Sequence, residues 1–130
     1  MTHDDNMESP PMELGTIAFR VTEDESSSDG IIDENRPFSL TTEFELLGSI
    51  PSPSRFTVNY SFESLGAGPE GILASISGEV DPKNHRYGDP DTTVRVEGGT
   101  LLRGIYRLTC SVDVSGQIIG YAEGPVIQIV

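Results

Sequence analysis

Residues 99–114, "GTLLRGIYRLTCSVDV", carry the clearest strand pattern of the chain. From position 106 onward apolar and polar side chains alternate, which predicts a β-strand with one face toward a core and the other toward solvent. Cys110, the only cysteine of the chain, lies on the apolar face, so its role is either that of a nucleophile or that of a packing residue. The predicted buried face consists of Tyr106, Leu108, Cys110, Val112 and Val114.

A reactive cysteine needs a lowered pKa, supplied by a helix N-terminus, a histidine or a cation, and it needs access to solvent. Cys110 stands in mid-strand between Leu108 and Val112, and no nearby helix is predicted that would lend a dipole. A buried free cysteine behaves as a small hydrophobic residue. We therefore predict a structural role for Cys110 and assign no catalytic or cofactor-binding residue.

Six further segments show a similar two-residue alternation, and turns rich in glycine and proline separate them. In one of them, "GILASISGEV", we expect Ile72, Ala74, Ile76 and Val80 to face inward, which leaves Leu73 facing outward. No segment has the 3.6-residue apolar period of a helix. The pattern predicts an all-β antiparallel sandwich of about seven strands. The six segments are 16–21, 37–46, 55–64, 71–80, 92–98 and 124–130.

The run Gly104-x-Tyr106-x-Leu108-x-Cys110 resembles the start of strand F in immunoglobulin-like sandwiches. In that fold the tyrosine hydroxyl turns back to a backbone group upstream, an arrangement called the tyrosine corner. Leu108 then stands where antibody domains carry a disulfide cysteine. The sequence has no second cysteine and no tryptophan, so the resemblance is to the disulfide-free relatives, with Tyr60 or Phe62 in the place of the tryptophan. It names no particular family.

The formal net charge of −13 is concentrated near the N-terminus. Ten of the 21 acidic residues fall in the first 34 positions, against a single base, Arg20. We expect a disordered acidic tail over 1–14, one sandwich domain over 15–130, and a mobile acidic loop over 22–36 within it. The serines of Ser26–Ser28 are flanked by acids, and whether they are modified is left open.

This charge also limits the partners. Nucleic-acid binding is disfavoured, because phosphate contacts need a basic face. A protein partner is expected, and a basic one would suit the charge. The start of the sequence lacks the pattern of a secretory signal and no apolar run is long enough to cross a membrane, so we expect a cytoplasmic protein without membrane contact.

The most polar loop, "DPKNHRYGDPD" at 81–91, carries the candidates for a cation or catalytic site. Carboxylates and a histidine in one loop are able to gather around a metal ion. The two Asp-Pro steps equally fit plain turn chemistry, which is the interpretation we favour. No cofactor motif is recognised. The four candidate residues are Asp81, His85, Asp89 and Asp91.

The function that these observations favour is a non-catalytic protein-interaction module, such as an adaptor, accessory subunit or decoration protein. It would bind through loops or through an edge strand, where unpaired backbone groups accept a partner strand or a second copy of the chain. The last strand, 124–130, is the candidate edge, although we expect it rather to complete its own sheet. Two alternatives stay open: a small metal-dependent or enzymatic module using the 81–91 loop, and a structural subunit of a larger assembly.

Overall fold

The computed structural model describes residues 11–23, 26–27 and 29–130. These residues contain ten strands and no helix, and hence no helix that would cross a membrane. The three strands beyond the seven expected are two residues long each. The strands are β1 (Glu13–Glu23), β2 (Ser26–Ser27), β3 (Ile31–Ile32), β4 (Phe38–Leu47), β5 (Ser54–Ser64), β6 (Glu70–Val80), β7 (Arg86–Tyr87), β8 (Val94–Val96), β9 (Gly104–Val114) and β10 (Gln117–Ile129).

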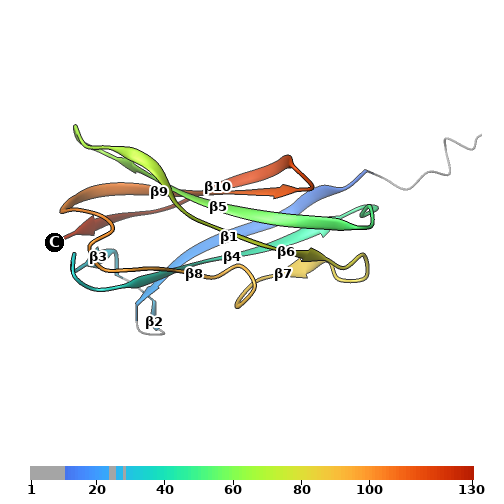
Figure 1. Cartoon of the computed structure of the whole chain (residues 1–130), viewed down its shortest axis with the longest axis horizontal. Helices are drawn as coiled ribbons and strands as arrows, with labels where there is room; N and C mark the ends of the chain where they lie inside the picture. The colour runs from blue at the N-terminus through green and yellow to red at the C-terminus, as the bar shows by residue number, and fades with distance from the viewer. Residues whose placement is uncertain (1–10, 24–25, 28) are drawn as a thin grey trace, which may run out of the picture.

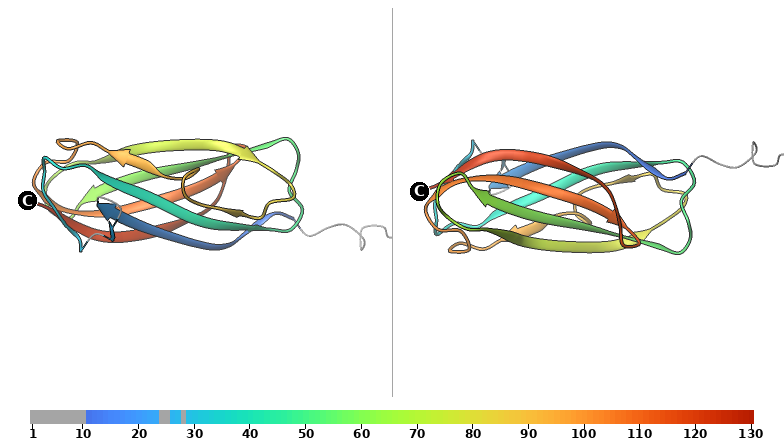
Figure 2. Two further views of the ribbon diagram at one scale, coloured as in Figure 1. Left: turned by 90° about the horizontal axis from the view of Figure 1, so that it is seen from below. Right: turned by 90° about the horizontal axis from the view of Figure 1, so that it is seen from above.

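The strands form two facing sheets (Figure 1). One has the order β2-β1-β4-β7, with β8 also paired to β4, and the other has the order β3-β10-β9-β5-β6. All strand pairs are antiparallel except β3 with β10. The second sheet is seen from outside in the right-hand view of Figure 2, where β10, β9, β5 and β6 run side by side and β6 forms the rim. The expected antiparallel sandwich is confirmed.

The strand predicted from the opening stretch, β9, lies in the interior of this second sheet. It pairs with β10 on one side and β5 on the other. A two-residue turn, Ser115–Gly116, joins β9 to β10, and both residues have positive φ (53° and 86°). Such turns match the twist of a β-hairpin, and glycine adopts the conformation without steric cost. All five side chains predicted to face inward on β9 are buried.

Between the sheets lies one core, built from the inward residues of both. Its aromatic centre joins Phe44 of β4, Phe56 of β5 and Tyr87 of β7, with ring centroids 5.2 to 5.5 Å apart. Tyr60 of β5 is buried and its ring meets Phe19 of β1 edge-on at 5.3 Å. Offset and edge-on arrangements of this kind add stabilisation beyond the area that they bury.

Segment 22–36, which was expected to be a mobile acidic loop, contains short strands. It holds the end of β1, then β2, then β3, whose Ile32 is fully buried. Gly30, with a φ of 91°, turns the chain so that Ile31–Ile32 pairs in parallel with the end of β10. Of the expected tail 1–14, residues 1–10 lie outside the described residues and β1 already begins at Glu13.

The expected facing of β6 is wrong at its beginning. Between the pairs Tyr60–Ala74 and Ser61–Ile72 the register shifts by one residue, a β-bulge that gives β6 one extra residue. A one-residue slip exchanges the two faces of a strand. Ile72 is therefore 72 % exposed, while Leu73 packs against the core.

Candidate interaction site

The hydroxyl of Tyr106 donates a hydrogen bond to the backbone carbonyl oxygen of Leu102 (2.7 Å). This contact, from a tyrosine at the start of β9 to a backbone group four residues upstream, has the geometry of a tyrosine corner. Cys110, two strand positions beyond Leu108, is 2 % exposed. Burial raises the pKa of the Cys110 thiol, which favours the unreactive protonated form. This environment suits a packing residue.

In the 81–91 loop the side chains of Asp81 and His85 are used locally. A carboxylate oxygen of Asp81 accepts a hydrogen bond from the backbone N–H of Lys83 (2.9 Å), which closes a turn. The Nδ1 atom of His85 lies 2.9 Å from the carbonyl oxygen of Leu46 on β4. Because a carbonyl only accepts, Nδ1 carries the proton. Both contacts fasten the loop to itself or to the neighbouring strand.

The other two candidates of this loop do not join them. Asp89 accepts a hydrogen bond from the hydroxyl of Thr93 (2.6 Å), and Asp91 is exposed. Over the described residues, no three His, Cys, Asp or Glu side chains are grouped so that they could hold a metal ion. The grouping that a metal site of Asp81, His85, Asp89 and Asp91 requires is therefore not observed in the described part of the chain.

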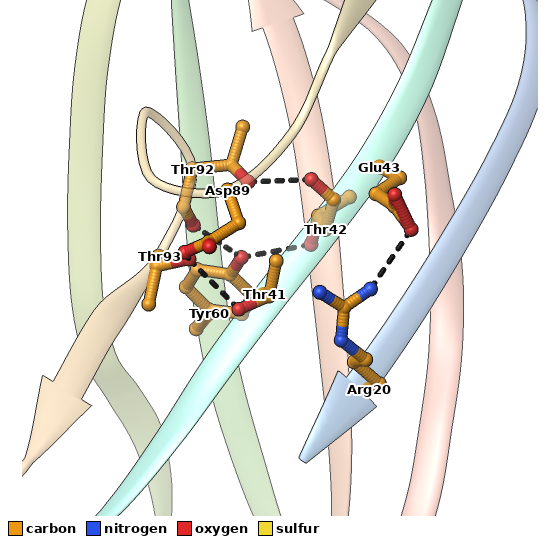
Figure 3. Close-up of polar contacts among 8 residues, drawn as sticks. All are labelled: Arg20, Thr41, Thr42, Glu43, Tyr60, Asp89, Thr92 and Thr93. Carbon is orange, nitrogen blue, oxygen red and sulfur yellow. Dashed lines mark hydrogen bonds and ion pairs between the residues drawn. The ribbon is translucent and has the colours of Figure 1, made fainter. Parts of the chain in front are cut away.

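A buried polar cluster that the sequence analysis did not identify links the two sheets (Figure 3). Thr42 on β4 donates a hydrogen bond to the hydroxyl of Tyr60 on β5 (2.8 Å), and that hydroxyl donates to the carbonyl oxygen of Thr92 (2.7 Å). The Thr92 hydroxyl donates in turn to the carbonyl oxygen of Thr42 (2.5 Å). All three residues are 0 % exposed, and the bonds close a ring.

This ring of hydrogen bonds gives Tyr60 a structural role in the core between the two sheets. Burial raises the pKa of the Tyr60 phenol, so the hydroxyl stays protonated and able to donate. A second chain of hydrogen bonds runs beside it, from Thr41 to Thr93 (2.8 Å) and from Thr93 to Asp89 (2.6 Å) (Figure 3). The polar residues around the 88–93 turn thus hold that turn against β4.

Two acidic residues of β4, Glu43 and Glu45, lie on the outer face of the first sheet. Glu43 forms an ion pair with Arg20 of β1 (2.8 Å), and Glu45 forms one with Arg86 of β7 (3.4 Å). A shallow hollow of about 400 Å³ lies between these strands and also includes Asp89. Largely exposed ion pairs of this kind contribute little to stability.

The two ends of the second sheet differ in how they are covered. At one end, β3 pairs with Gln128 and Ile129 of the thirteen-residue strand β10, so it covers only the end of that strand. At the other end, β6 pairs with β5 along its length and with no other described strand. β8 of the facing sheet lies near β6, but among the described residues the two strands form no β-ladder.

The unpaired side of β6 is long and little protected. The strand has eleven residues and contains no lysine and no proline, and its only charged residues are Glu70 and Glu79. Natural proteins usually protect an edge strand with charged residues, especially lysine, or with proline, or they keep the strand short. Besides these two glutamates, β6 is protected by the bulge at Leu73, which lies near the beginning of the strand.

A hollow of about 510 Å³ lies on the outer face of the second sheet, next to the beginning of β6. Ile72 lies at its β6 side, in register with Ser61 of β5. Farther along the same cross-strand row are Thr109 of β9 and Glu123 of β10. The hollow also includes a charged row made of Glu70, Glu63 and Arg107.

A second exposed apolar feature lies at the same end of this face. Ile31 of β3 and Ile105 of β9 flank Gln128 of β10 in one cross-strand row. Leu65, which donates its backbone N–H to the carbonyl oxygen of Ile105 (2.9 Å), continues the row beyond β5. Ile31, Ile105 and Leu65 are all about half exposed, so the row is an exposed strip across the sheet that is apolar except at Gln128.

This architecture is that of an immunoglobulin-like β-sandwich, and comparison with solved structures supports that class. An immunoglobulin-like protein of Pseudomonas aeruginosa matches at a TM-score of 0.52 and 11 % identity, over 93 % of this chain and 98 % of that one. The CARDB domain of a Pyrococcus furiosus protein, in complex with di-metal ions, matches at a TM-score of 0.57 and 14 % identity, over 91 % and 96 %.

Part of a larger protein is similar as well. A β-glucosidase of Listeria innocua in complex with glucose matches at a TM-score of 0.54 and 9 % identity, over 87 % of this chain and 16 % of the enzyme. At these identities the likeness shows the fold alone. No family model matches the sequence, and no curated protein sequence matches it.

Proposed function

We propose that this chain is a non-catalytic protein-interaction module, acting as an adaptor, accessory subunit or decoration protein. Its partner adds an extended segment to the free edge of β6. The observation that carries the proposal is the eleven-residue strand β6, paired on one side only among the described strands. An exposed sheet edge gives affinity through main-chain hydrogen bonds, and neighbouring pockets give specificity through alternate side chains.

Other features of the chain agree with this proposal. Cys110 is buried, and three of the four polar candidates of the 81–91 loop, Asp81, His85 and Asp89, make hydrogen bonds to Lys83, Leu46 and Thr93. One of the similar solved structures is described with di-metal ions, but the residues described here offer no comparable group of ligands. Cytoplasmic residence belongs to the same proposal, because a chain with one cysteine needs no oxidising compartment to fold.

The test is a selection of peptides from a random display library on the intact protein. Selected peptides are synthesised and titrated while amide hydrogen exchange is followed. We expect slower exchange in β6, because edge amides gain hydrogen bonds when a strand is added. As a matched control, each peptide is made in two N-methylated versions, one methylated at the odd-numbered residues and the other at the even-numbered residues. Only the version whose methylated N–H groups point toward β6 should lose binding.

Two results would contradict β-strand addition. In the first, both N-methylated versions bind as well as the parent peptide, which means that the peptide backbone does not pair. In the second, the exchange changes fall outside β6, for example in the 81–91 loop. A selection that yields no binder to the folded protein would count against the interaction-module proposal as a whole.

A structural subunit of a larger assembly is the second candidate, and the exposed apolar strip Ile31–Ile105–Leu65 favours it. A sheet face of this kind is buried when another sandwich packs on it. Sedimentation of the intact protein against Ile105→Lys tests this candidate. Self-association that the lysine removes would support it, and a monomer at all concentrations would exclude assembly of this chain with itself.

A further inference from the structure

We infer that the strand accepted by β6 carries a lysine or arginine two residues away from an apolar residue, with both side chains on the outer face of the sheet. This inference rests on the proposed function, since it names the partner chemistry of the same edge. It follows from three features of the beginning of β6: the exposed Ile72, the acidic residues around the adjacent hollow, and the register that an added strand must take.

The first feature is Ile72. The bulge at Leu73 turns Ile72 out of the core, and its side chain is 72 % exposed at the rim of the hollow. In a β-ladder the residue directly opposite lies on the same face, with its Cβ atom about 5 Å away. An apolar residue of the added strand opposite Ile72 therefore covers it, and both side chains leave water.

The second feature is the charge around the hollow. Its titratable residues are the acids Glu63, Glu70 and Glu123 and one base, Arg107. All three acids are exposed, and Glu63 and Glu70 are direct cross-strand neighbours. The hollow is thus negative overall, like the chain as a whole at −13. A positive side chain of the partner would be attracted here at low ionic strength.

The third feature is the register. Glu70 is two strand positions before Ile72, so both residues lie on the outer face. A partner residue two positions from the one opposite Ile72 therefore lies opposite Glu70. Its side chain has to reach across one strand spacing, about 5 Å, to meet Glu63 as well. Lysine and arginine have this length, and their apolar stems can lie along the sheet.

A second copy of this chain fits the edge less well. Antiparallel pairing of two β6 strands about Ser75, with the bulged residue Leu73 left out of the count, places Glu79 of one copy directly opposite Glu70 of the other. This arrangement occurs twice, once at each end of the paired strands. Like charges directly opposite each other are destabilising, and each copy carries a net charge of −13. The charge therefore favours a different, basic partner.

The test uses the peptides selected on the intact protein, the best of them also in a version with its basic residue changed to glutamate. We expect the selected peptides to share a basic residue two positions from an apolar one. Exchange of the base for glutamate should weaken binding about three- to tenfold at low salt, as expected for one or two exposed ion pairs. High salt should remove most of this difference.

Two protein variants locate the effect. In Glu70→Lys the preference for the basic peptide should disappear or reverse. Glu79→Lys is the matched control, because it makes the same change of charge on the same strand and face, at the far end. It should keep most of the preference. Both positions are exposed, so neither change is expected to disturb folding.

Failure of this inference can be told apart from failure of the proposed function. Peptides that protect β6 from exchange but bind equally well with a base or with glutamate would overturn the inferred chemistry and leave strand addition in place. Equal effects of the two protein variants would overturn the inferred position of the base. A β6-dependent dimer in sedimentation, insensitive to salt, would replace the basic partner with a second copy. Absence of any β6-directed peptide would overturn both proposals.

Discussion

Replacing Tyr60 with phenylalanine removes one buried oxygen atom and leaves the aromatic ring in place. The hydroxyl accepts a hydrogen bond from Thr42 (2.8 Å) and donates one to the carbonyl oxygen of Thr92 (2.7 Å). Tyr60→Phe leaves a donor on one side and an acceptor on the other without this partner, at positions that water does not reach. The ring contact with Phe19 is retained, so no large cavity forms.

The expected cost follows from these two hydrogen bonds. A buried polar group that loses its partner costs about 1–3 kcal/mol, and hydroxyl groups reorient to recover part of this. We therefore expect Tyr60→Phe to lower the free energy of unfolding by about 2–4 kcal/mol, measured by urea denaturation at neutral pH. The control is Tyr121→Phe, whose side chain is 67 % exposed and which should change stability by no more than about 0.5 kcal/mol.

A double-mutant cycle tests the ring more strictly. Thr42→Val removes the donor that Tyr60→Phe leaves unpaired, so the double variant should be more stable than the sum of the single effects predicts. We expect a coupling of about 1 kcal/mol. Additive effects, or a loss for Tyr60→Phe no larger than for the Tyr121→Phe control, would refute the view that this ring of hydrogen bonds stabilises the sandwich.

Three further predictions concern pH, the thiol and the packing of β6. Burial raises the pKa of Tyr60 and of Cys110 above their ordinary values of 10.0 and 9.0, so in alkaline solution the folded state keeps protons that the unfolded state loses. The free energy of unfolding should therefore fall above about pH 9, by up to about 1.4 kcal/mol per pH unit and group. Tyr60→Phe should make this fall less steep. Urea unfolding between about pH 8 and about pH 11 measures this fall, and a flat profile would contradict it. A thiol reagent should label Cys110 only as fast as the protein unfolds; rapid labelling of the folded protein would contradict its burial. In Gly78→Ala the new Cβ would lie 2.6 Å from the Phe56 ring, which should cost about 1–3 kcal/mol in denaturation, whereas Gly66→Ala, with its nearest atom at 4.0 Å, should cost little.

The strand pattern of this chain was readable from the sequence because most strands have one face on the core. On β9, five successive inward positions are apolar, and all five are buried. In β5, which shows the same alternation, Phe56, Val58 and Tyr60 are also buried. Where burial alone decides which residue type is tolerated, apolar residues at every second position show directly which side chains face the core.

The sequence contained only part of the information needed to predict the buried ring of hydrogen bonds. Thr42 occupies an inward position between Leu40 and Phe44, and a polar residue at such a position has to find a hydrogen-bond partner. The sequence does not say which partner, because Tyr60 and Thr92 belong to the facing sheet and to a turn 50 residues away. Periodicity reports burial, whereas pairing across the core depends on how the two sheets are placed.

The bulge at the beginning of β6 also had a signal, although a small one. Ile72, Leu73 and Ala74 are three apolar residues in succession, which strict alternation does not explain. One of them had to be assigned outward, and Leu73 was the wrong choice. An inserted residue reverses the facing of everything before it, so a single bulge was enough to hide the exposed Ile72 on which the proposed site depends.

The free edge itself could not be predicted, because alternation reports which face of a strand is buried and says nothing of its lateral neighbours. The sequence pointed to the last strand as the candidate edge, but β3 covers the end of β10. That cover comes from Ile31–Ile32, an apolar pair in an otherwise acidic segment. At the other end of the sheet, no described strand covers β6 in the way that β3 covers the end of β10. β6 is an edge strand because no other described strand pairs with its second side. This depends on the arrangement of all the strands, so no single stretch of sequence can predict it.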